Sequence, residues 1–282
     1  MNLENIITKA SKKLKNSNIY SHALDAQILL ADIMGVKREF LFINNEISIS
    51  KKIIKKYDAA IERRTKSEPI AYILGKKEFW SENFLVNQST LVPRPETELL
   101  IYKIISFVNY KKINILDIGT GSGCILLSLL KELNHSRGVG IDISSKAIET
   151  AIINSKKLNL HNRSKFKIFD LAKYYFEKYD LIVSNPPYIL TKDINKLSKD
   201  IVNYEPRTAL DGGVDGLDLI KKVIYKSNHL LKRNGILALE IGFNQYLKVS
   251  SLLKYYRFRE MGKVYDYNRN VRCIISTKLD SF

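Results

Sequence analysis

Two consecutive prolines stand between an asparagine and a tyrosine. The segment Asn185-Pro186-Pro187-Tyr188 directly follows residues 180–184, Asp-Leu-Ile-Val-Ser, which have an apolar centre. Such a run predicts a buried strand, and open α/β sheets bind ligands at the carboxyl ends of their strands. Each proline fixes its own φ, lacks an N–H donor and forces the preceding residue into an extended conformation. We therefore expect a stiff loop that offers hydrogen-bond acceptors.

This loop could bind a planar –NH2 group. The side-chain oxygen of Asn185 and the carbonyl of Pro186 could accept both of its hydrogens, and the Tyr188 ring could stack on its face. An amide or aromatic amine is a poor nucleophile, so aiming its nitrogen at a methyl donor could replace a strong general base. The predicted catalytic residues are Asn185, Pro186 and Tyr188, and the predicted substrate contacts are Asn185, Pro186, Pro187 and Tyr188. A strand that merely ends in two prolines is the weaker alternative.

A glycine-rich turn lies upstream and predicts a cofactor site. Residues 114–124 read Asn-Ile-Leu-Asp-Ile-Gly-Thr-Gly-Ser-Gly-Cys, the pattern of a strand, a tight turn and a helix start. A nicotinamide-binding turn would use G-x-G-x-x-G to bind a pyrophosphate, whereas G-x-G-x-G favours S-adenosylmethionine, which has no phosphate. A tight turn without any ligand is the alternative. We interpret Cys124 as a small buried helix residue.

Further polar residues lie where the next strands should end. Asp142 is in the position from which a carboxylate usually accepts hydrogen bonds from ribose hydroxyls. Asp170 and Leu171 follow the third strand and could contact an adenine ring. The predicted cofactor contacts are Asp117, Gly119, Thr120, Gly121, Ser122, Gly123, Asp142, Asp170, Leu171 and Asn185.

The chain divides into parts of different character. Residues 1–75 have apolar residues at helical spacing, and we expect Ser21 to cap the second helix and Gly35 to end it. Residues 76–90 predict a β-hairpin linker with its turn at residues 81–83. Residues 91–282 alternate strands and helices, which predicts a Rossmann-like α/β domain with a doubly wound parallel sheet and an antiparallel hairpin at its edge. The expected strands are 113–117, 138–141, 166–169, 180–184, 236–241 and 271–276.

Composition narrows the functional classes. The two cysteines do not indicate a disulfide framework, and the four histidines show no metal-ligand spacing, so no metal is predicted. No apolar run is long enough to span a membrane and the N-terminus does not resemble a secretory signal, so we expect a cytoplasmic, monomeric protein. The formal net charge of +17 could indicate nucleic-acid binding. However, the basic residues are dispersed along the chain, and direct nucleic-acid binding is not expected.

Over nearly its whole length the sequence resembles the HemK/PrmC-type glutamine methyltransferases of peptide chain release factors. Two blocks are the most specific, Leu-Val-Pro-Arg-Pro-Glu-Thr-Glu at residues 91–98 and Glu-Pro-Arg-Thr-Ala-Leu at residues 205–210. The residues 68–75 (Glu-Pro-Ile-Ala-Tyr-Ile-Leu-Gly), the glycine turn, the loop at 185–188 and the glycines at 212, 213 and 216 also match. Residues 93–98 have a second interpretation as a turn and helix start, with Glu96 and Glu98 favourable for the helix dipole.

The resemblance implies an activity and a partner. It implies methylation of the glutamine in the Gly-Gly-Gln motif of class-1 release factors with S-adenosylmethionine, by a Rossmann-like domain preceded by a helical domain. Many relatives carry an aromatic residue near Asp170 and Leu171, which this chain lacks at those positions. A related branch modifies a ribosomal protein and usually continues Val-Pro-Arg with Ser-Pro. Here Pro-Glu-Thr-Glu follows, which favours release factors.

Two interpretations from other classes remain. A methyltransferase for adenine or guanine amines in nucleic acid would use a similar loop and would account for the charge. It would ordinarily need a target-recognition segment after the loop. An assembly module that binds the cofactor without catalysis is the other possibility, with the helical domain as its docking surface. For the enzyme, we interpret residues 1–75 as a partner-recognition domain, and a role only in packing and stability is the alternative.

Overall fold

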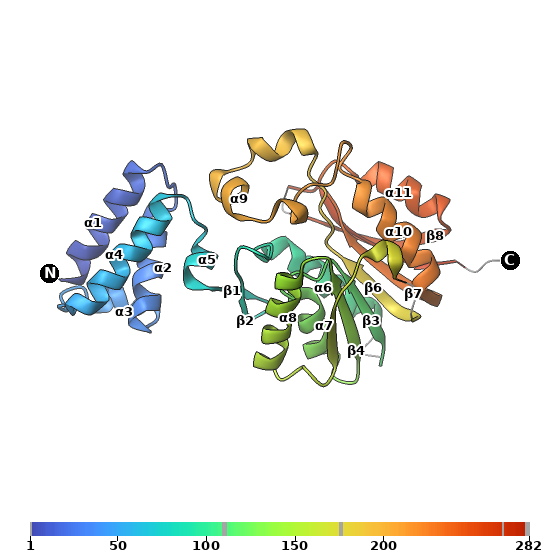
Figure 1. The fold of residues 1–282 in the computed structure, drawn as a ribbon, viewed down its shortest axis with the longest axis horizontal. Coiled ribbons are helices and arrows are strands. Elements are labelled where there is room, and N and C mark those ends of the chain that lie inside the picture. Colours follow the sequence, from blue (N-terminus) through green and yellow to red (C-terminus); the bar gives the residue numbers. More distant parts are fainter. Residues whose placement is uncertain (1, 109–111, 175–176, 267, 280–282) are drawn as a thin grey trace. The chain divides into compact units, whose positions relative to one another are not determined.

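The computed structural model describes residues 2–108, 112–174, 177–266 and 268–279 (Figure 1). The chain forms two compact units. The first comprises Met1–Lys76 together with Ser198–Tyr204, and the second comprises Lys77–Leu197 together with Glu205–Phe282. The three-part division expected from the sequence stays a prediction.

The first unit is helical. Apolar side chains at helical spacing, among them Leu3, Ile6, Leu14 and Tyr57, are buried in one core. The hydroxyl of Tyr57 donates to the carbonyl of Ala26 at 2.9 Å. The helices are α1 (Leu3–Asn16), α2 (His22–Met34), α3 (Arg38–Ile43), α4 (Lys51–Thr65), α5 (Ile70–Leu74) and, from the later segment, α9 (Lys199–Tyr204).

The C-terminal end of α2 agrees with the prediction, whereas the N-terminal end does not. Gly35 ends the helix in the left-handed conformation with φ of 69°. Ser21 occupies the N-cap position, but the prediction that its side chain caps the helix is wrong, because its hydroxyl donates to Asp25 Oδ2 at 2.7 Å instead. Asp25 also accepts from Arg64 Nε at 2.7 Å, so the serine hydroxyl completes a buried ion pair.

The second unit contains a seven-stranded sheet in the order β5-β4-β3-β6-β7-β9-β8. The first five strands in this order are parallel, whereas β9 is antiparallel to both β7 and β8. This confirms the predicted α/β class and the antiparallel edge. The strands are β3 (Asn114–Ile118), β4 (Arg137–Asp142), β5 (Ser164–Ile168), β6 (Tyr179–Ser184), β7 (Leu231–Glu240), β8 (Phe258–Tyr265) and β9 (Val271–Lys278).

Helices cover both faces of this sheet (Figure 1). Alternate residues of one strand serve opposite faces: Leu116 belongs to the core under α10 and α11, and Ile115 belongs to the core under α6 and α7. The helices are α6 (Pro95–Val108), α7 (Cys124–Glu132), α8 (Ser145–Lys157), α10 (Asp218–Leu230) and α11 (Tyr246–Tyr255), and the short turns are η1 (Leu171–Lys173), η2 (Thr191–Lys196) and η3 (Arg207–Ala209).

The order of the strands reverses between β3 and β6. From β3 the chain builds outward to β4 and β5 and then returns to place β6 on the other side of β3. The register pairs Ile118 at the end of β3 with Ser184 at the end of β6. The residues that follow these two ends therefore emerge side by side, in the crevice where doubly wound sheets bind ligands.

Three sequence predictions of element bounds need correction. Strand β8 was not expected, and β7 begins at Leu231, earlier than the predicted residue 236. The hairpin consists of β1 (Lys76–Phe79) and β2 (Glu82–Leu85), and its turn lies at Trp80 and Ser81. Both turn residues have positive φ, 51° and 58°, as the tight two-residue turns of hairpins require. A bulky tryptophan gives no sequence signal for such a turn.

Within the described residues, none of the helices is both apolar enough and long enough to cross a membrane.

Gly140 of β4 supports the glycine turn from below and provides a test of the packing. A Cβ at this position would lie 2.7 Å from both Phe166 Cδ1 and Thr120 Oγ1. We expect Gly140→Ala to lower the free energy of unfolding by about 1–3 kcal/mol through overpacking. The matched control is Gly262→Ala in β8, whose Cβ would come no closer than 3.3 Å to its nearest neighbours, Lys103 Cε and Phe107 Cζ. Urea unfolding of both variants measures the difference, and equal losses would contradict this account.

Candidate active site

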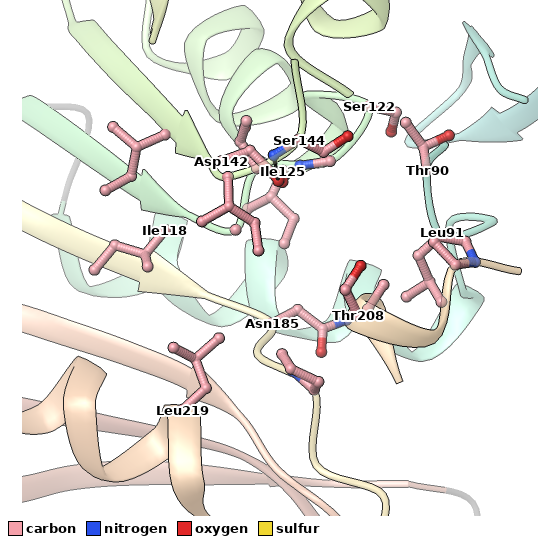
Figure 2. A pocket seen from close by; sticks show the side chains of 18 of the residues that line it. Thr90, Leu91, Ile118, Ser122, Ile125, Asp142, Ser144, Asn185, Thr208 and Leu219 are labelled. Carbon is pink, nitrogen blue, oxygen red and sulfur yellow. Dashed lines mark hydrogen bonds between the residues drawn. The ribbon is translucent and has the colours of Figure 1, made fainter. Parts of the chain in front are cut away.

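A cavity of about 370 Å³ lies in the second unit at the carboxyl ends of β3, β4 and β6. This volume is within the range of small-molecule sites. Figure 2 shows Asp142 and Ser144 on one side of it, with Asn185 and Thr208 on the opposite side. The lining residues come from the ends of β3, β4 and β6, the glycine turn, the start of α7, the segments at η1 and η3, α10, the segment before α6, and Thr97 of α6.

The glycine turn is shaped for close approach of a ligand. Gly119 and Gly121 line the cavity with positive φ of 72° and 54°, and a Cβ on either would meet no atom within 4 Å. The space above them is therefore open, and glycine is needed for the backbone conformation. Gly123 has a different role, because a Cβ there would lie 3.2 Å from Ala151, Leu127 and Phe166. It allows α7 to start close to its neighbours.

Asp142 fixes the turn to the end of β4. Its Oδ2 accepts from the Gly121 N–H at 3.0 Å, and its Oδ1 accepts from the Ser144 N–H at 2.9 Å. Each carboxylate oxygen has a second lone pair, so the side chain can still accept hydrogen bonds from a ligand. The turn is held on its other side by the buried Asn154, which donates to the Ser122 carbonyl at 2.9 Å and exchanges hydrogen bonds with the Leu85 backbone.

Asp117 lies beneath the turn and is fully buried. Its Oδ2 accepts from the Thr120 hydroxyl at 2.7 Å, and its Oδ1 has no hydrogen-bond partner among the described residues. Burial raises the pKa of Asp117 to about 7, and the hydrogen bond from Thr120 acts in the opposite direction. The carboxyl group therefore keeps its proton in mildly acidic solution.

The wall near η1 contains an aromatic residue that the sequence interpretation overlooked. Asp170 and Leu171 line the cavity as expected, with Asp170 also accepting from the Ala172 N–H at 2.9 Å. Phe169 lines it as well, and its ring packs edge-on against Tyr174 with centroids 5.2 Å apart. The expectation that an aromatic is missing here is therefore wrong. It failed because the aromatic precedes the two predicted contacts.

A chain of hydrogen bonds orients the Asn185 carboxamide. Its Nδ2 donates to Thr97 Oγ1 at 3.2 Å, and the Thr97 hydroxyl donates to Glu240 Oε2 at 2.7 Å. Thr97 and Glu240 are both buried. Because Nδ2 is engaged with Thr97, Oδ1 is left as an acceptor, and it takes no hydrogen bond from the described residues. Asn185 thus presents an oxygen at the edge of the cavity.

Tyr188 is anchored at both ends. Its hydroxyl accepts from Arg272 Nη2 at 2.9 Å and lies 3.3 Å from Glu240 Oε1, to which it donates. The Arg272 guanidinium carbon lies 5.4 Å from the centroid of the Tyr188 ring. Gln245 Nε2 donates to the Tyr188 carbonyl and to the Gly216 carbonyl, both at 3.0 Å. Burial raises the pKa of Tyr188 to about 12, so the phenol remains neutral.

The two motif blocks that are distant in sequence meet beside the cavity. Arg94 forms an ion pair with Glu205 at 2.6 Å, and the Val92 N–H donates to the same carboxylate at 3.4 Å. Glu205 is buried. Arg94 and Pro206 both line the cavity. The Arg94–Glu205 ion pair therefore holds together two segments that form part of the cavity wall.

Comparison with known proteins supports this architecture. Residues 5–75 match the family model described as the PrmC N-terminal domain, and residues 109–242 match a methyltransferase domain. The release factor glutamine methyltransferase of Buchnera aphidicola subsp. Schizaphis graminum is 43% identical over 99% of this chain and 100% of its own length. The enzyme of the same name from Clostridium acetobutylicum is 37% identical over 99% of both.

The chain belongs to the release factor glutamine methyltransferase family. This confirms the resemblance seen in the sequence. Among solved structures, a methyltransferase from Pyrococcus furiosus matches with a TM-score of 0.54, 17% identity and coverage of 79% of this chain and 98% of that one. A ribosomal protein L11 methylase from Lactobacillus delbrueckii subsp. bulgaricus matches at 0.50 and 19%, covering 67% and 81%. Both support the methyltransferase fold.

The family's sequence motifs do not all reach the cavity. The predicted residues that line it are Gly119, Thr120, Gly121, Ser122, Asp142, Asp170, Leu171, Asn185 and Pro187. The predicted residues outside its lining are Asp117, Gly123, Pro186 and Tyr188. Asp117 and Gly123 support the turn from behind. Contacts of Pro186 and Tyr188 with a substrate stay predictions.

Sequence reasoning missed three residues around the Asn-Pro-Pro-Tyr loop, namely Thr97, Glu240 and Arg272. A signal was present for one of them. Glu240 ends an apolar strand, as Asp142 does, and the carboxyl ends of parallel strands meet at the edge of the sheet where ligands bind. Thr97 lies in the motif block 91–98, where its hydroxyl was not considered. Arg272 comes from a strand at the far end of the chain, and only the fold places it there.

Cys124 lines the cavity, yet burial raises the pKa of its thiol to about 12. The thiol is therefore protonated near neutral pH, which does not favour a role as a nucleophile.

Asp117 provides a pH-dependent test. An unfolded aspartate loses its proton near pH 3.8, whereas folded Asp117 keeps it up to about pH 7. The folded state binds more protons between these values, so this residue lowers the free energy of unfolding as pH rises from about 4 to 7. Asp117→Asn lacks this effect. We expect the variant to gain stability relative to the wild type over that interval, by up to about 4 kcal/mol.

Urea unfolding of both proteins at several pH values between 4 and 7 measures this difference. A wild-type–variant difference that does not change with pH would show that folded Asp117 is ionised throughout the interval.

Proposed function

We propose that this protein transfers a methyl group from S-adenosylmethionine to the side-chain amide nitrogen of the glutamine in the Gly-Gly-Gln motif of class-1 release factors. The observation that carries the proposal is the oriented carboxamide of Asn185 beside the glycine turn. The full-length similarity to release factor glutamine methyltransferases supports the choice of substrate.

The cavity residues fit the proposed cofactor. The open backbone at Gly119 and Gly121 would admit the ligand, Asp142 would accept from ribose hydroxyls, and Phe169 and Leu171 would enclose the adenine between apolar surfaces. When bound, S-adenosylmethionine supplies an electrophilic methyl group on a positively charged sulfur. The residues of the chain would bind the two substrates, orient them and exclude water from the site.

The acceptor nitrogen would be oriented by the loop that follows β6. Asn185 Oδ1 and the Pro186 carbonyl would accept the two hydrogens of the glutamine –NH2, and neither oxygen accepts a hydrogen bond within the described part of the chain. Two such acceptors would fix the nitrogen and increase its electron density. The Pro186 and Pro187 rings remove competing N–H donors from the loop. The nitrogen proton leaves after methyl transfer.

A nucleic-acid amine is the second candidate substrate, because a methyltransferase that flips out a base could use a similar loop. The full-length similarity to release factor glutamine methyltransferases disfavours it. A glutamine of a ribosomal protein is the closer alternative, and the residues after Arg94 favour release factors.

The first test is a transfer assay. Purified protein is incubated with isotopically labelled S-adenosylmethionine and, in parallel, with a class-1 release factor, ribosomal proteins and nucleic acid. We expect label in the release factor, located by mass spectrometry on the glutamine of Gly-Gly-Gln. The matched control is the same release factor with that glutamine replaced by alanine, which should stay unlabelled. Label found only in ribosomal protein or only in nucleic acid would overturn the proposal.

The second test removes one acceptor. Asn185→Ala deletes the oxygen that would hold one hydrogen of the target –NH2. We expect kcat/KM to fall by about 10²-fold, or about 3 kcal/mol of transition-state stabilisation, by analogy with removal of one positioned oxyanion-hole donor. Steady-state kinetics with the release factor provide the measurement, with Asn203→Ala on α9 as a surface control. Near-normal turnover in Asn185→Ala would remove this residue from the mechanism.

A further inference from the structure

One buried carboxylate is linked by hydrogen bonds to both ends of the Asn-Pro-Pro-Tyr loop. Glu240 is 1% exposed and does not line the cavity. One of its oxygens accepts from Thr97, which contacts Asn185, and the other accepts from the Tyr188 hydroxyl. Asn185 and Tyr188 are the first and last residues of the loop. Glu240 is therefore linked to both of them without reaching the cavity itself.

The direction of each hydrogen bond follows from this carboxylate. The Thr97 hydroxyl donates its single hydrogen to Glu240 Oε2 at 2.7 Å. The Thr97 oxygen can then only accept from Asn185, which requires the Nδ2 end of the carboxamide to face it. Oδ1 is thereby directed away from Thr97. On the other side, Tyr188 donates to Glu240 and so receives the N–H of Arg272.

We infer that Glu240 is a positioning residue that, through Thr97, selects the carboxamide orientation of Asn185 in which the oxygen and not the –NH2 faces the acceptor. This inference rests on the proposed function, because it assigns a consequence to that orientation. With the carboxamide reversed, an –NH2 would face the –NH2 of the target, and both groups are donors at that contact. The loop would then lose one acceptor without losing any of its own residues.

Burial and charge around Glu240 are consistent with this role. Burial raises the pKa of Glu240, while the hydrogen bond from Thr97 and the nearby Arg272 guanidinium oppose that rise. In the structure each of its two oxygens accepts from one hydroxyl, Thr97 on one side and Tyr188 on the other. A buried carboxylate is costly unless its lone pairs are occupied, which provides a physical reason for the paired donors Thr97 and Tyr188.

The test uses two substitutions at Thr97, one that removes the hydroxyl and one that keeps it. Thr97→Val keeps the shape of the side chain but can neither accept from Asn185 nor donate to Glu240, whereas Thr97→Ser keeps the hydroxyl. We expect kcat with the release factor to fall about 10²-fold in Thr97→Val, with KM for the release factor within about threefold, and to be restored to within about threefold of wild type in Thr97→Ser. Unfolding measurements show whether each variant is folded at the assay temperature.

A second variant acts on the carboxylate directly. Glu240→Gln keeps the size of the side chain but places an –NH2 where one oxygen accepts, so Thr97 and Tyr188 can no longer both donate to it. We expect a fall in kcat of about tenfold or more with unchanged binding of S-adenosylmethionine by calorimetry. This variant also keeps the inference testable should Thr97→Val not fold.

The outcomes separate the two proposals. Wild-type transfer to the release factor, with equal kcat in Thr97→Val and Thr97→Ser, would overturn the positioning role and leave the proposed function in place. The same holds if Thr97→Val changes only KM, or if Glu240→Gln retains wild-type kcat. Absence of any transfer by the wild-type enzyme would overturn both.

Discussion

The parallel pairing of β3 with β6 is the constraint on which the site depends. Their register ends with Ile118 opposite Ser184, and the Ser184 hydroxyl donates to the Ile118 carbonyl at 2.7 Å. The next residues are Gly119 and Asn185. The pairing therefore delivers the first glycine of the turn and the first residue of the acceptor loop to neighbouring positions, although they are far apart in the sequence. A ladder of backbone hydrogen bonds fixes this separation, so no flexible segment has to bring the two loops together.

Two buried acids support the two loops in different ways. Asp117 lies under the glycine turn, where one of its oxygens has no hydrogen-bond partner in the described part of the chain, and burial raises its pKa to about 7. Glu240 lies behind the acceptor loop and accepts from two hydroxyls. A carboxyl group that keeps its proton avoids much of the cost of burial, whereas an ionised one requires donors around it. Glu240 has a hydroxyl donor at each oxygen, whereas Asp117 has one such donor among the described residues.

The sequence predicted the fold and the two loops because their signals are local. Alternating strand and helix patterns, glycines at 119, 121 and 123, and the two prolines each depend on neighbours within a few residues. The residues that hold the acceptor loop in place could not be predicted from local patterns. Thr97, Glu240 and Arg272 come from α6, β7 and β9, and only the strand order brings them to Tyr188 and Asn185. The predicted position of the hairpin turn was wrong for another reason, because packing at Trp80 and Ser81 outweighed the turn preferences of these residues.

The contacts of residues 91–98 also explain why several polar residues occur together in this block. Interpreted locally, the block is a turn followed by a helix start with favourable acids. In the structure its polar side chains contact three separate parts of the chain: Arg94 binds Glu205, Thr97 donates to Glu240, and Glu98 accepts from the Trp80 N–H at 2.8 Å. Pro95 is the first residue of α6. If the helix began one residue earlier or later, its side chains would point in other directions, and all three contacts would be misplaced at once. A dipole effect alone would tolerate such a shift, because charge near a helix terminus does not need a particular partner. The block is therefore better understood as the junction that joins the hairpin, the β7 carboxylate and the Glu205 segment around one cavity.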